Sequence, residues 1–175
     1  LACWDRARLN SLFPGHRNIL TTIFSKSDKP LILDAGCGNG QTGMLFFEDF
    51  IPKARYLAVD ISDAVNIASK KLNKGKIKNF CIQCDLNNIP IKDNSVDIVF
   101  CPHVLQHTDS LKNSVFSLFK HLKDGGVAFL YCTKPSKPIR QLSDKFLRDS
   151  ISKLPADKAF EQLSSLTKLG RSLSS

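Results

Sequence analysis

Short apolar runs alternate with amphipathic stretches along the middle of the 175-residue chain, between residues 29 and 133. The runs have the length of buried strands, and the stretches between them have the apolar spacing of helices. This alternation predicts an α/β fold of the Rossmann-like, doubly wound type, with a mainly parallel sheet and helices on both faces. The predicted strands span residues 31–35, 55–60, 78–83, 96–101 and 127–132, with helices at 42–50, 63–72 and 111–122.

The segments on either side of this core have a different character. Residues 1–28 are predicted to be helical, with an interruption at Pro14-Gly15. Residues 134–175 are rich in Ser and Lys and hold Pro-punctuated helical segments without a strand-like run, so we predict a basic helical tail. The outer edge of the last strand is expected to be covered by this tail or by a partner chain. The chain is thus divided into a flank (1–28), a core (29–133) and a tail (134–175). Buried stripes are expected from Leu9, Leu12, Ile19, Leu20 and Ile23 in the flank, and from Leu111, Val115, Phe116, Leu118, Phe119 and Leu122 in the core.

Composition narrows the class of protein. Hydrophobic residues make up 42% and charged residues 23%, as in ordinary globular domains. No apolar run approaches the ~20 residues of a membrane span, and the N-terminus lacks a signal-peptide layout. Six cysteines without such a signal are expected to be reduced thiols in a cytoplasmic protein. Cys81 and Cys84 have metal or redox spacing, but no second pair accompanies them, and we predict no metal site.

The charge distribution does not identify the class of binding partner. Lys and Arg total 25 against 16 acids, a net charge of +9. A basic balance is compatible with a nucleic-acid partner, but no dense basic block interleaved with aromatic residues is present, so nucleic-acid binding is not favoured. Lys70, Lys71, Lys74, Lys76 and Lys78 are interpreted as a solvated face. The sequence does not indicate an oligomeric state.

The glycine-rich segment from Leu31 to Gly43 carries the clearest functional signal. Glycines at the carboxyl end of a strand let the backbone approach a ligand and open a helix whose amides point at it. Two registers overlap: one runs over Gly36, Gly38 and Gly40, and the other has the dinucleotide spacing Gly38-x-Gly40-x-x-Gly43. The first is preferred because it directly follows a strand that ends in an acid, Asp34. A carboxylate there repels a pyrophosphate and attracts an ammonium group, so the ligand is expected to be a nucleoside that carries an amino acid.

Further acids follow the next strands. Asp60 ends the second strand, where a carboxylate accepts hydrogen bonds from ribose hydroxyls, and Ile61 beside it is suited to pack on adenine. Asp85 follows the third strand and is suited to an adenine amino group. These positions meet at the carboxyl ends of adjacent strands, where open α/β sheets bind ligands.

Seven segments of the core resemble, in order and spacing, the landmarks of the class I S-adenosylmethionine-dependent methyltransferases, closest to the group with small-molecule and quinone-biosynthesis enzymes. The resemblance covers residues 30–133, and it implies two further closing strands that are not visible after Cys132. The segments are Leu33-Asp-Ala-Gly-Cys-Gly-Asn-Gly40, Val59-Asp-Ile61, Cys84-Asp-Leu86, Ile89-Pro90, Asn94-Ser-Val-Asp-Ile-Val-Phe100, Val104-Leu-Gln-His-Thr108 and Leu122-Lys-Asp-Gly-Gly126.

The resemblance implies roles for individual residues. The methionine moiety would be held by the Asp34–Gly40 segment, the ribose and adenine by Asp60 and Ile61, and the adenine edge by Asp85 and Leu86. Cys101 would face the sulfonium. The cofactor-binding set is Asp34, Gly36, Cys37, Gly38, Gly40, Asp60, Ile61, Asp85, Leu86 and Cys101.

The implied reaction is in-line transfer of a methyl group from S-adenosylmethionine to a small-molecule acceptor, with S-adenosylhomocysteine as the product. His103 and His107 follow the fourth strand, where a base for the acceptor would lie, although His107 could equally pack or cap at the start of a helix. Three alternatives stay open: a nicotinamide- or flavin-dependent oxidoreductase on the overlapping glycine register, a non-catalytic cofactor-binding subunit, and an RNA methyltransferase. Against the last, Cys101-Pro-His-Val104 lacks the Asn-Pro-Pro-aromatic signature of enzymes that methylate exocyclic base amines.

Overall fold

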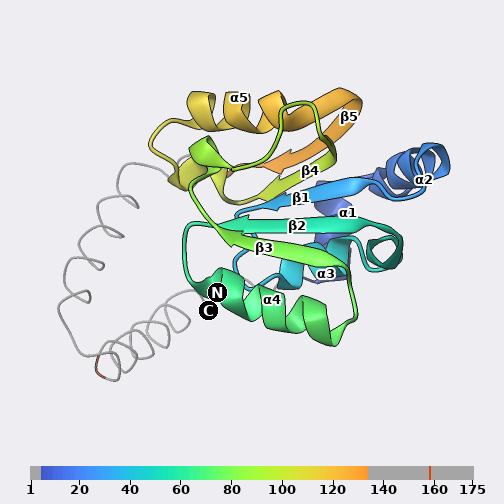
Figure 1. Cartoon of the computed structure of the whole chain (residues 1–175), viewed down its shortest axis with the longest axis horizontal. Helices are drawn as coiled ribbons and strands as arrows, with labels where there is room; N and C mark the ends of the chain where they lie inside the picture. The colour runs from blue at the N-terminus through green and yellow to red at the C-terminus, as the bar shows by residue number, and fades with distance from the viewer. Residues whose placement is uncertain (1–4, 134–157, 159–175) are drawn as a thin grey trace, which may run out of the picture. The chain divides into compact units, whose positions relative to one another are not determined.

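The computed structural model describes residues 5–133 and residue 158, and the predicted tail lies almost wholly outside them. Five parallel strands form one sheet in the order β3-β2-β1-β4-β5 (Figure 1). This arrangement confirms the predicted Rossmann-like α/β fold. The strands are β1 (Leu31–Ala35), β2 (Arg55–Asp60), β3 (Asn79–Gln83), β4 (Val96–Pro102) and β5 (Leu122–Tyr131).

Helices cover both faces of this sheet. Figure 1 shows α5 on one side of the sheet and α3 and α4 on the other. None of the helices in the described part of the chain is long and apolar enough to cross a membrane. The α-helices are α1 (Arg6–Leu12), α2 (His16–Lys26), α3 (Gln41–Phe46), α4 (Ala64–Lys74) and α5 (Leu111–His121), and single 3-10 turns lie at Ile51–Lys53, Leu86–Asn88 and Leu105–His107.

The sheet separates two apolar clusters, because successive strand residues point to opposite faces. The cluster on the side of α1–α4 is rich in aromatic rings, among which Phe46 stacks on Phe100 at 4.5 Å between centroids. The cluster on the side of α5 is aliphatic and is built on Leu33, Leu57 and Leu118. Both halves of the core therefore come from alternate residues of the same strands.

The predicted stripe of α5 is wrong at three positions. Leu111, Phe116 and Phe119 are 50%, 64% and 49% exposed, whereas Leu118 is fully buried. An α-helix turns about 100° per residue, so Phe116 lies on the side opposite Leu118, and Phe119 lies about a quarter of a turn away from it. In the flank, Ile19 is likewise 40% exposed, while Leu9 and Leu20 are buried.

Element ends differ from the predictions in two places. The helix expected over residues 42–50 ends at Phe46 and continues as turns toward Pro52. β5 begins at Leu122 rather than after Gly126: Leu122 pairs with Val96, and Val127 pairs with Ile98, so the residues between them bulge outward. Gly125 provides the positive φ of 75° that this bulge requires.

Candidate functional site

A cleft of about 170 Å³ lies at the carboxyl ends of the strands. Four chain segments meet there: the loop after β1, the end of β2, the 3-10 turn after β3, and the residues between β4 and α5. Six of the predicted site residues line it, together with four that the sequence interpretation missed. The predicted ones are Gly36, Asp60, Ile61, Asp85, Leu86 and His107, and the additional ones are Asn87, Val104, Thr108 and Asp109.

The loop after β1 passes against the segment after β4 so closely that only glycine fits. Gly36 has a φ of 77°, and a Cβ atom on it would lie 2.3 Å from Cγ2 of Val104. The amides of Gly36 and Cys37 both donate to the carbonyl of Val59, at 2.8 and 2.9 Å. The loop is therefore held on β2 and packed under Val104, and this close packing requires glycine at position 36.

Asp60 connects this loop to the end of β2. One carboxylate oxygen accepts the amide of Gly38 at 2.7 Å, and the other accepts the amide and the hydroxyl of Ser62 at 2.9 and 2.7 Å. A carboxylate offers about four lone-pair sites. Asp60 thus orders the protein side of the cleft and keeps acceptor capacity toward it.

Asp34 lies beneath the loop and does not line the cleft. Its side chain is 2% exposed, and the Tyr56 hydroxyl donates to it at 2.6 Å. Burial raises the pKa of the Asp34 carboxyl to about 7; the Tyr56 hydrogen bond opposes this rise, and the charge of Asp60 adds to it. Gly43 makes room for the pair, since a Cβ there would lie 1.9 Å from the Tyr56 oxygen. The expected contact of Asp34 with a ligand ammonium group is not supported by this geometry.

The two cysteines of the predicted set also lie away from the cleft. Cys101 is fully buried in the aliphatic cluster and is not among the residues that line the cleft. Cys37 is buried in the aromatic cluster, and burial raises the pKa of its thiol. Side chains alternate along β4, and this alternation directs the Cys101 side chain toward α5. Gly38 and Gly40 shape the loop without lining the cleft.

The two histidines are separated by the structure. His107 lines the cleft from the turn Leu105–His107, and its Nε2 lies 3.3 Å from Nε2 of Gln106. His103 lies outside the lining, with its amide donating to the Tyr131 carbonyl at 2.7 Å and its ring edge-to-face with that of Tyr131. Burial, with the charges of Arg8 and His107, lowers the pKa of His103. His107 is therefore the histidine that a bound acceptor could reach.

The charge of the cleft is opposite to that of the whole chain. Asp60, Asp85 and Asp109 line it, and no Lys or Arg is among the lining residues that the structure describes. Asp85 also accepts the amide of Asn87 at 2.8 Å, which fixes the turn that carries Leu86. Ile61, 71% exposed, offers an apolar surface at the rim. Such a cleft favours a cationic ligand with an apolar ring and disfavours a pyrophosphate.

The Cys81–Cys84 pair has no metal-site geometry around it. In the part of the chain that is described, no group of three His, Cys, Asp or Glu side chains could hold a metal ion. The five cysteines described there are free thiols.

Comparison with known proteins gives the family context of this cleft. The family model described as a methyltransferase domain matches residues 33–130, more than half of the chain. A malonyl-[acyl-carrier protein] O-methyltransferase of Hamiltonella defensa is 28% identical over 117 residues, which are 66% of this chain and 42% of that protein. A demethylmenaquinone methyltransferase of Symbiobacterium thermophilum is 28% identical over 128 residues, 70% of this chain and 49% of that protein. The chain thus spans about half the length of these curated relatives.

A solved structure shares the fold. The geranyl diphosphate C-methyltransferase of Streptomyces coelicolor, crystallised with Mg²⁺, geranyl diphosphate and S-adenosylhomocysteine, has a TM-score of 0.58. The two chains are 18% identical, and the match covers 75% of this chain and 53% of that one. The matched family segment holds almost the whole sheet, the glycine loop and the whole cleft lining. By its sequence, its sheet order and the place of its cleft, this chain belongs to the methyltransferase-domain family.

Proposed function

We propose that this chain transfers a methyl group from S-adenosylmethionine to a small-molecule acceptor. The observation that carries the proposal is the cleft itself: a glycine loop and three carboxylates at the carboxyl ends of parallel strands, with no Lys or Arg among the described lining residues. S-adenosylmethionine combines a sulfonium, an ammonium group, a ribose and an adenine, which match this lining. A dinucleotide would instead bring two phosphate charges against the same acids, so the oxidoreductase alternative is not favoured.

The chain's own residues provide binding and orientation in this proposal. Asp60 would accept the ribose hydroxyls, Ile61 would pack on the adenine face, and Asp85 with Leu86 would meet the adenine edge. Gly36, which lines the cleft, would let the methionine moiety approach the loop, since glycine places no side chain there. The bound cofactor supplies an activated methyl group. Alignment of the acceptor with it, with water excluded, can contribute ~7–11 kcal/mol to lowering the barrier.

His107 is the proposed general base. It reaches the cleft, and an imidazole can remove a proton from a phenol, enol or acid acceptor near neutral pH. His103 is left out of this role because it lies outside the lining and packs against Tyr131. An acceptor that carries no acidic proton would not need His107.

A small-molecule acceptor is supported by the relatives, whose names give malonyl-[acyl-carrier protein] and demethylmenaquinone as what they act on. The acceptor of this chain is proposed only at the level of a small molecule, or a small group carried by a protein. A cytoplasmic location, which free thiols favour, stays a prediction.

Calorimetric titration of the full chain tests the cofactor. We expect saturable binding of S-adenosylmethionine and S-adenosylhomocysteine, and no binding of NAD or FAD at the same concentrations. Binding of NAD in place of S-adenosylmethionine would contradict the proposal and restore the oxidoreductase reading.

A further inference from the structure

The outer edge of β3 has no neighbouring strand among the described residues. In the sheet order β3-β2-β1-β4-β5, β2 is the only strand in the described part of the chain that pairs with β3. The amide of Tyr56 donates to the carbonyl of Lys78 at 3.1 Å, and the amide of Cys84 donates to the carbonyl of Asp60 at 2.9 Å. Because parallel strands alternate, these bonds direct residues 78, 80, 82 and 84 toward β2. The backbone groups of Asn79, Cys81 and Gln83 therefore face outward.

An apolar groove of about 290 Å³ lies beside this edge. It exists because α4 covers only one face of β3, whereas the connection from β3 to β4 holds a single 3-10 turn and no helix over the other face. Phe80 is consequently 63% exposed. The groove is lined by Leu31, Leu57, Phe80, Ile82 and Ile91, with Cys81 at the edge and Arg55 at one end.

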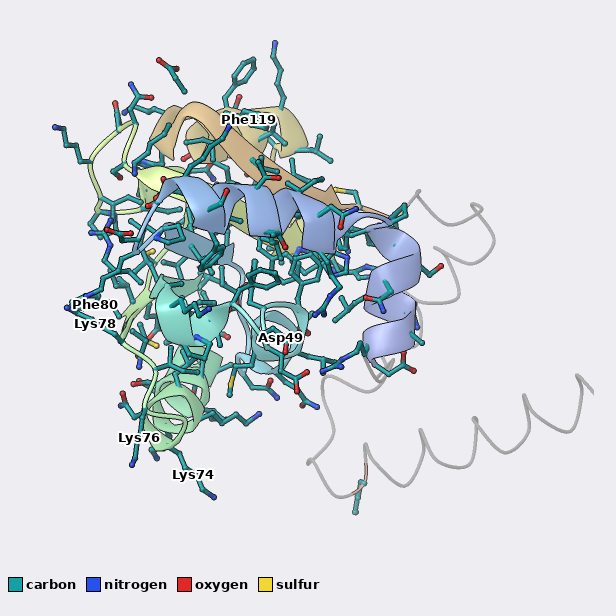
Figure 2. The ribbon with its side chains drawn as sticks, turned by 90° about the vertical axis from the view of Figure 1, so that its right-hand side faces the viewer. Asp49, Lys74, Lys76, Lys78, Phe80 and Phe119 are labelled. Carbon is teal, nitrogen blue, oxygen red and sulfur yellow. The ribbon has the colours of Figure 1, made fainter. Side chains whose placement is uncertain are left out.

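A basic rim adjoins the groove. Lys74, Lys76 and Lys78 are exposed on the segment that leads into β3, and Figure 2 shows them with Phe80 along one side of the molecule. Lys29, Lys53 and Arg55 are exposed at the starts of the neighbouring strands β1 and β2. None of the ion pairs found among the described residues involves these six cations.

We propose that this edge is a docking surface for an extended segment of an acidic protein partner. The segment adds a strand to β3 through the outward backbone groups of Asn79, Cys81 and Gln83. Its alternate apolar side chains enter the groove beside Phe80, and its acidic residues meet the lysine rim. Strand addition of this kind takes affinity from main-chain hydrogen bonds and specificity from the pockets for alternate side chains.

Charge separates this occupant from a second copy of the chain. A second copy of the chain would bring its own net charge of +9 to an edge that is already basic, and lysines on an edge strand are a known protection against such pairing. An acidic strand instead gains from the same residues. A nucleic acid would use the lysines but would leave the apolar groove and the strand edge unfilled.

The groove and the lysine rim lie toward the amino ends of the strands, and the cleft lies at their carboxyl ends. A partner docked on β3 would therefore leave the cleft open. It would also order the strand that leads into Asp85, one of the cleft acids. The proposal does not depend on which reaction the cleft supports.

The test uses the full chain and a synthetic probe, the capped peptide Glu-Val-Glu-Leu-Glu-Val-Glu. NMR-detected hydrogen exchange should show that the amides of Asn79, Cys81 and Gln83 become protected when the peptide binds, while those of Phe80 and Ile82 are protected beforehand. A peptide of the same composition with its apolar residues adjacent, Glu-Glu-Val-Leu-Val-Glu-Glu, should bind at least about tenfold more weakly, because only an alternating strand presents one apolar face.

Matched variants localise the binding. Phe80→Glu and the pair Lys76→Glu and Lys78→Glu should each weaken peptide binding about tenfold or more. Phe116→Glu, at an equally exposed phenylalanine on α5, should leave it unchanged. Circular dichroism confirms that each variant is folded.

Three results would overturn the proposal. The first is no binding of the alternating peptide, and the second is equal binding of the two peptides. The third is retained affinity in a folded Phe80→Glu chain. If oligo(dT) or vesicles of phosphatidylglycerol bind at the lysines while neither peptide does, the rim is a general polyanion surface, and strand addition is rejected.

Discussion

Asp60 is the residue on which the cleft depends most, because one carboxylate orders the glycine loop and faces the proposed ribose position. From sequence alone, Asp60→Ala is expected to weaken cofactor binding and to leave folding almost untouched. The bonds to Gly38 and Ser62 change the second half of that expectation. Asp60 therefore stabilises the backbone at Gly38 and Ser62 as well as the proposed ligand.

For Asp60→Ala we therefore expect two effects. Affinity for S-adenosylhomocysteine should fall by about 10²-fold or more, since hydrogen bonds to a charged group contribute ~1.5–3 kcal/mol each. The free energy of unfolding should also fall, by about 1–3 kcal/mol, because the Gly38 amide loses its partner. Calorimetry and a ligand-free denaturant titration measure the two. Near wild-type affinity in a folded variant would contradict the role of Asp60 and, with it, the cofactor assignment.

Asp109, which the sequence interpretation missed, lines the cleft without a hydrogen bond to a described residue. S-adenosylmethionine carries one more positive charge than S-adenosylhomocysteine. Asp109→Asn should therefore weaken binding of the former about 2–5-fold and leave that of the latter nearly unchanged, as expected for one partly solvated charge interaction. Asp124→Asn, at an exposed acid outside the cleft lining, is the matched control. Equal losses for both ligands would show that Asp109 does not contribute through charge.

His107→Asn tests the proposed base. Once an acceptor is identified, turnover should fall by ~10²–10⁴, with unchanged affinity for S-adenosylhomocysteine, if the acceptor must lose a proton. The lost activity should return partly at raised pH, because hydroxide can then take the proton. Turnover equal to that of the wild type would give His107 a packing role at the turn Leu105–His107.

At the scale of elements, the contact between the loop after β1 and the segment after β4 closes one side of the cleft. Gly36→Ala would place a methyl group against Val104 in a backbone conformation that L-residues rarely adopt. We expect a loss of about 2–4 kcal/mol of stability and loss of measurable cofactor binding.

The double variant Gly36→Ala with Val104→Ala separates the two causes of that loss. Removing the two valine methyl groups relieves the shortest contacts but leaves Cβ of residue 104 at 2.9 Å and the positive φ, so about half of the stability should return. A thermal melt of both variants beside Val104→Ala alone measures this. If the double variant recovers no stability, the backbone conformation, and not the contact with Val104, requires glycine at position 36.

At the scale of the whole molecule, the buried Asp34 makes stability depend on pH. Its pKa is raised to about 7 in the folded chain, against about 3.9 in an unfolded one. Between these values the folded state binds the additional proton. The stability that this group contributes is therefore complete below about pH 4 and is lost as the pH rises through about 7, by at most about 1.4 kcal/mol per pH unit.

Asp34→Asn should remove this dependence, because an amide has no proton to lose and still accepts the Tyr56 hydroxyl. Denaturant titrations from about pH 4.5 to pH 7.5 should show the variant gaining stability relative to the wild type as the pH rises. Parallel curves for the two proteins would mean that Asp34 keeps an ordinary pKa in the folded state.

The parallel sheet, the glycine loop and the acids at the strand ends were all predicted from the sequence, because they depend on local properties. Periodicity identifies strands and helices within a few residues, and glycine marks the turn after β1. The family resemblance places Asp60, Ile61 and Asp85 at one edge of the sheet, since the carboxyl ends of parallel strands share an edge. The structure places all three in one cleft.

Only the tertiary structure decided which strand-end side chains face that cleft and which face the core. Asp34 and Cys101 turn inward, toward Tyr56 and the aliphatic cluster, because the layers above and below the sheet leave them no path to the cleft. Asp109 reaches the cleft from the chain after β4, and Val104 closes over Gly36 across 68 positions of sequence. The exposure of Phe80 has the same origin, since it follows from a face of β3 that no described helix covers. Contacts between distant segments decide these orientations, and no local pattern records them.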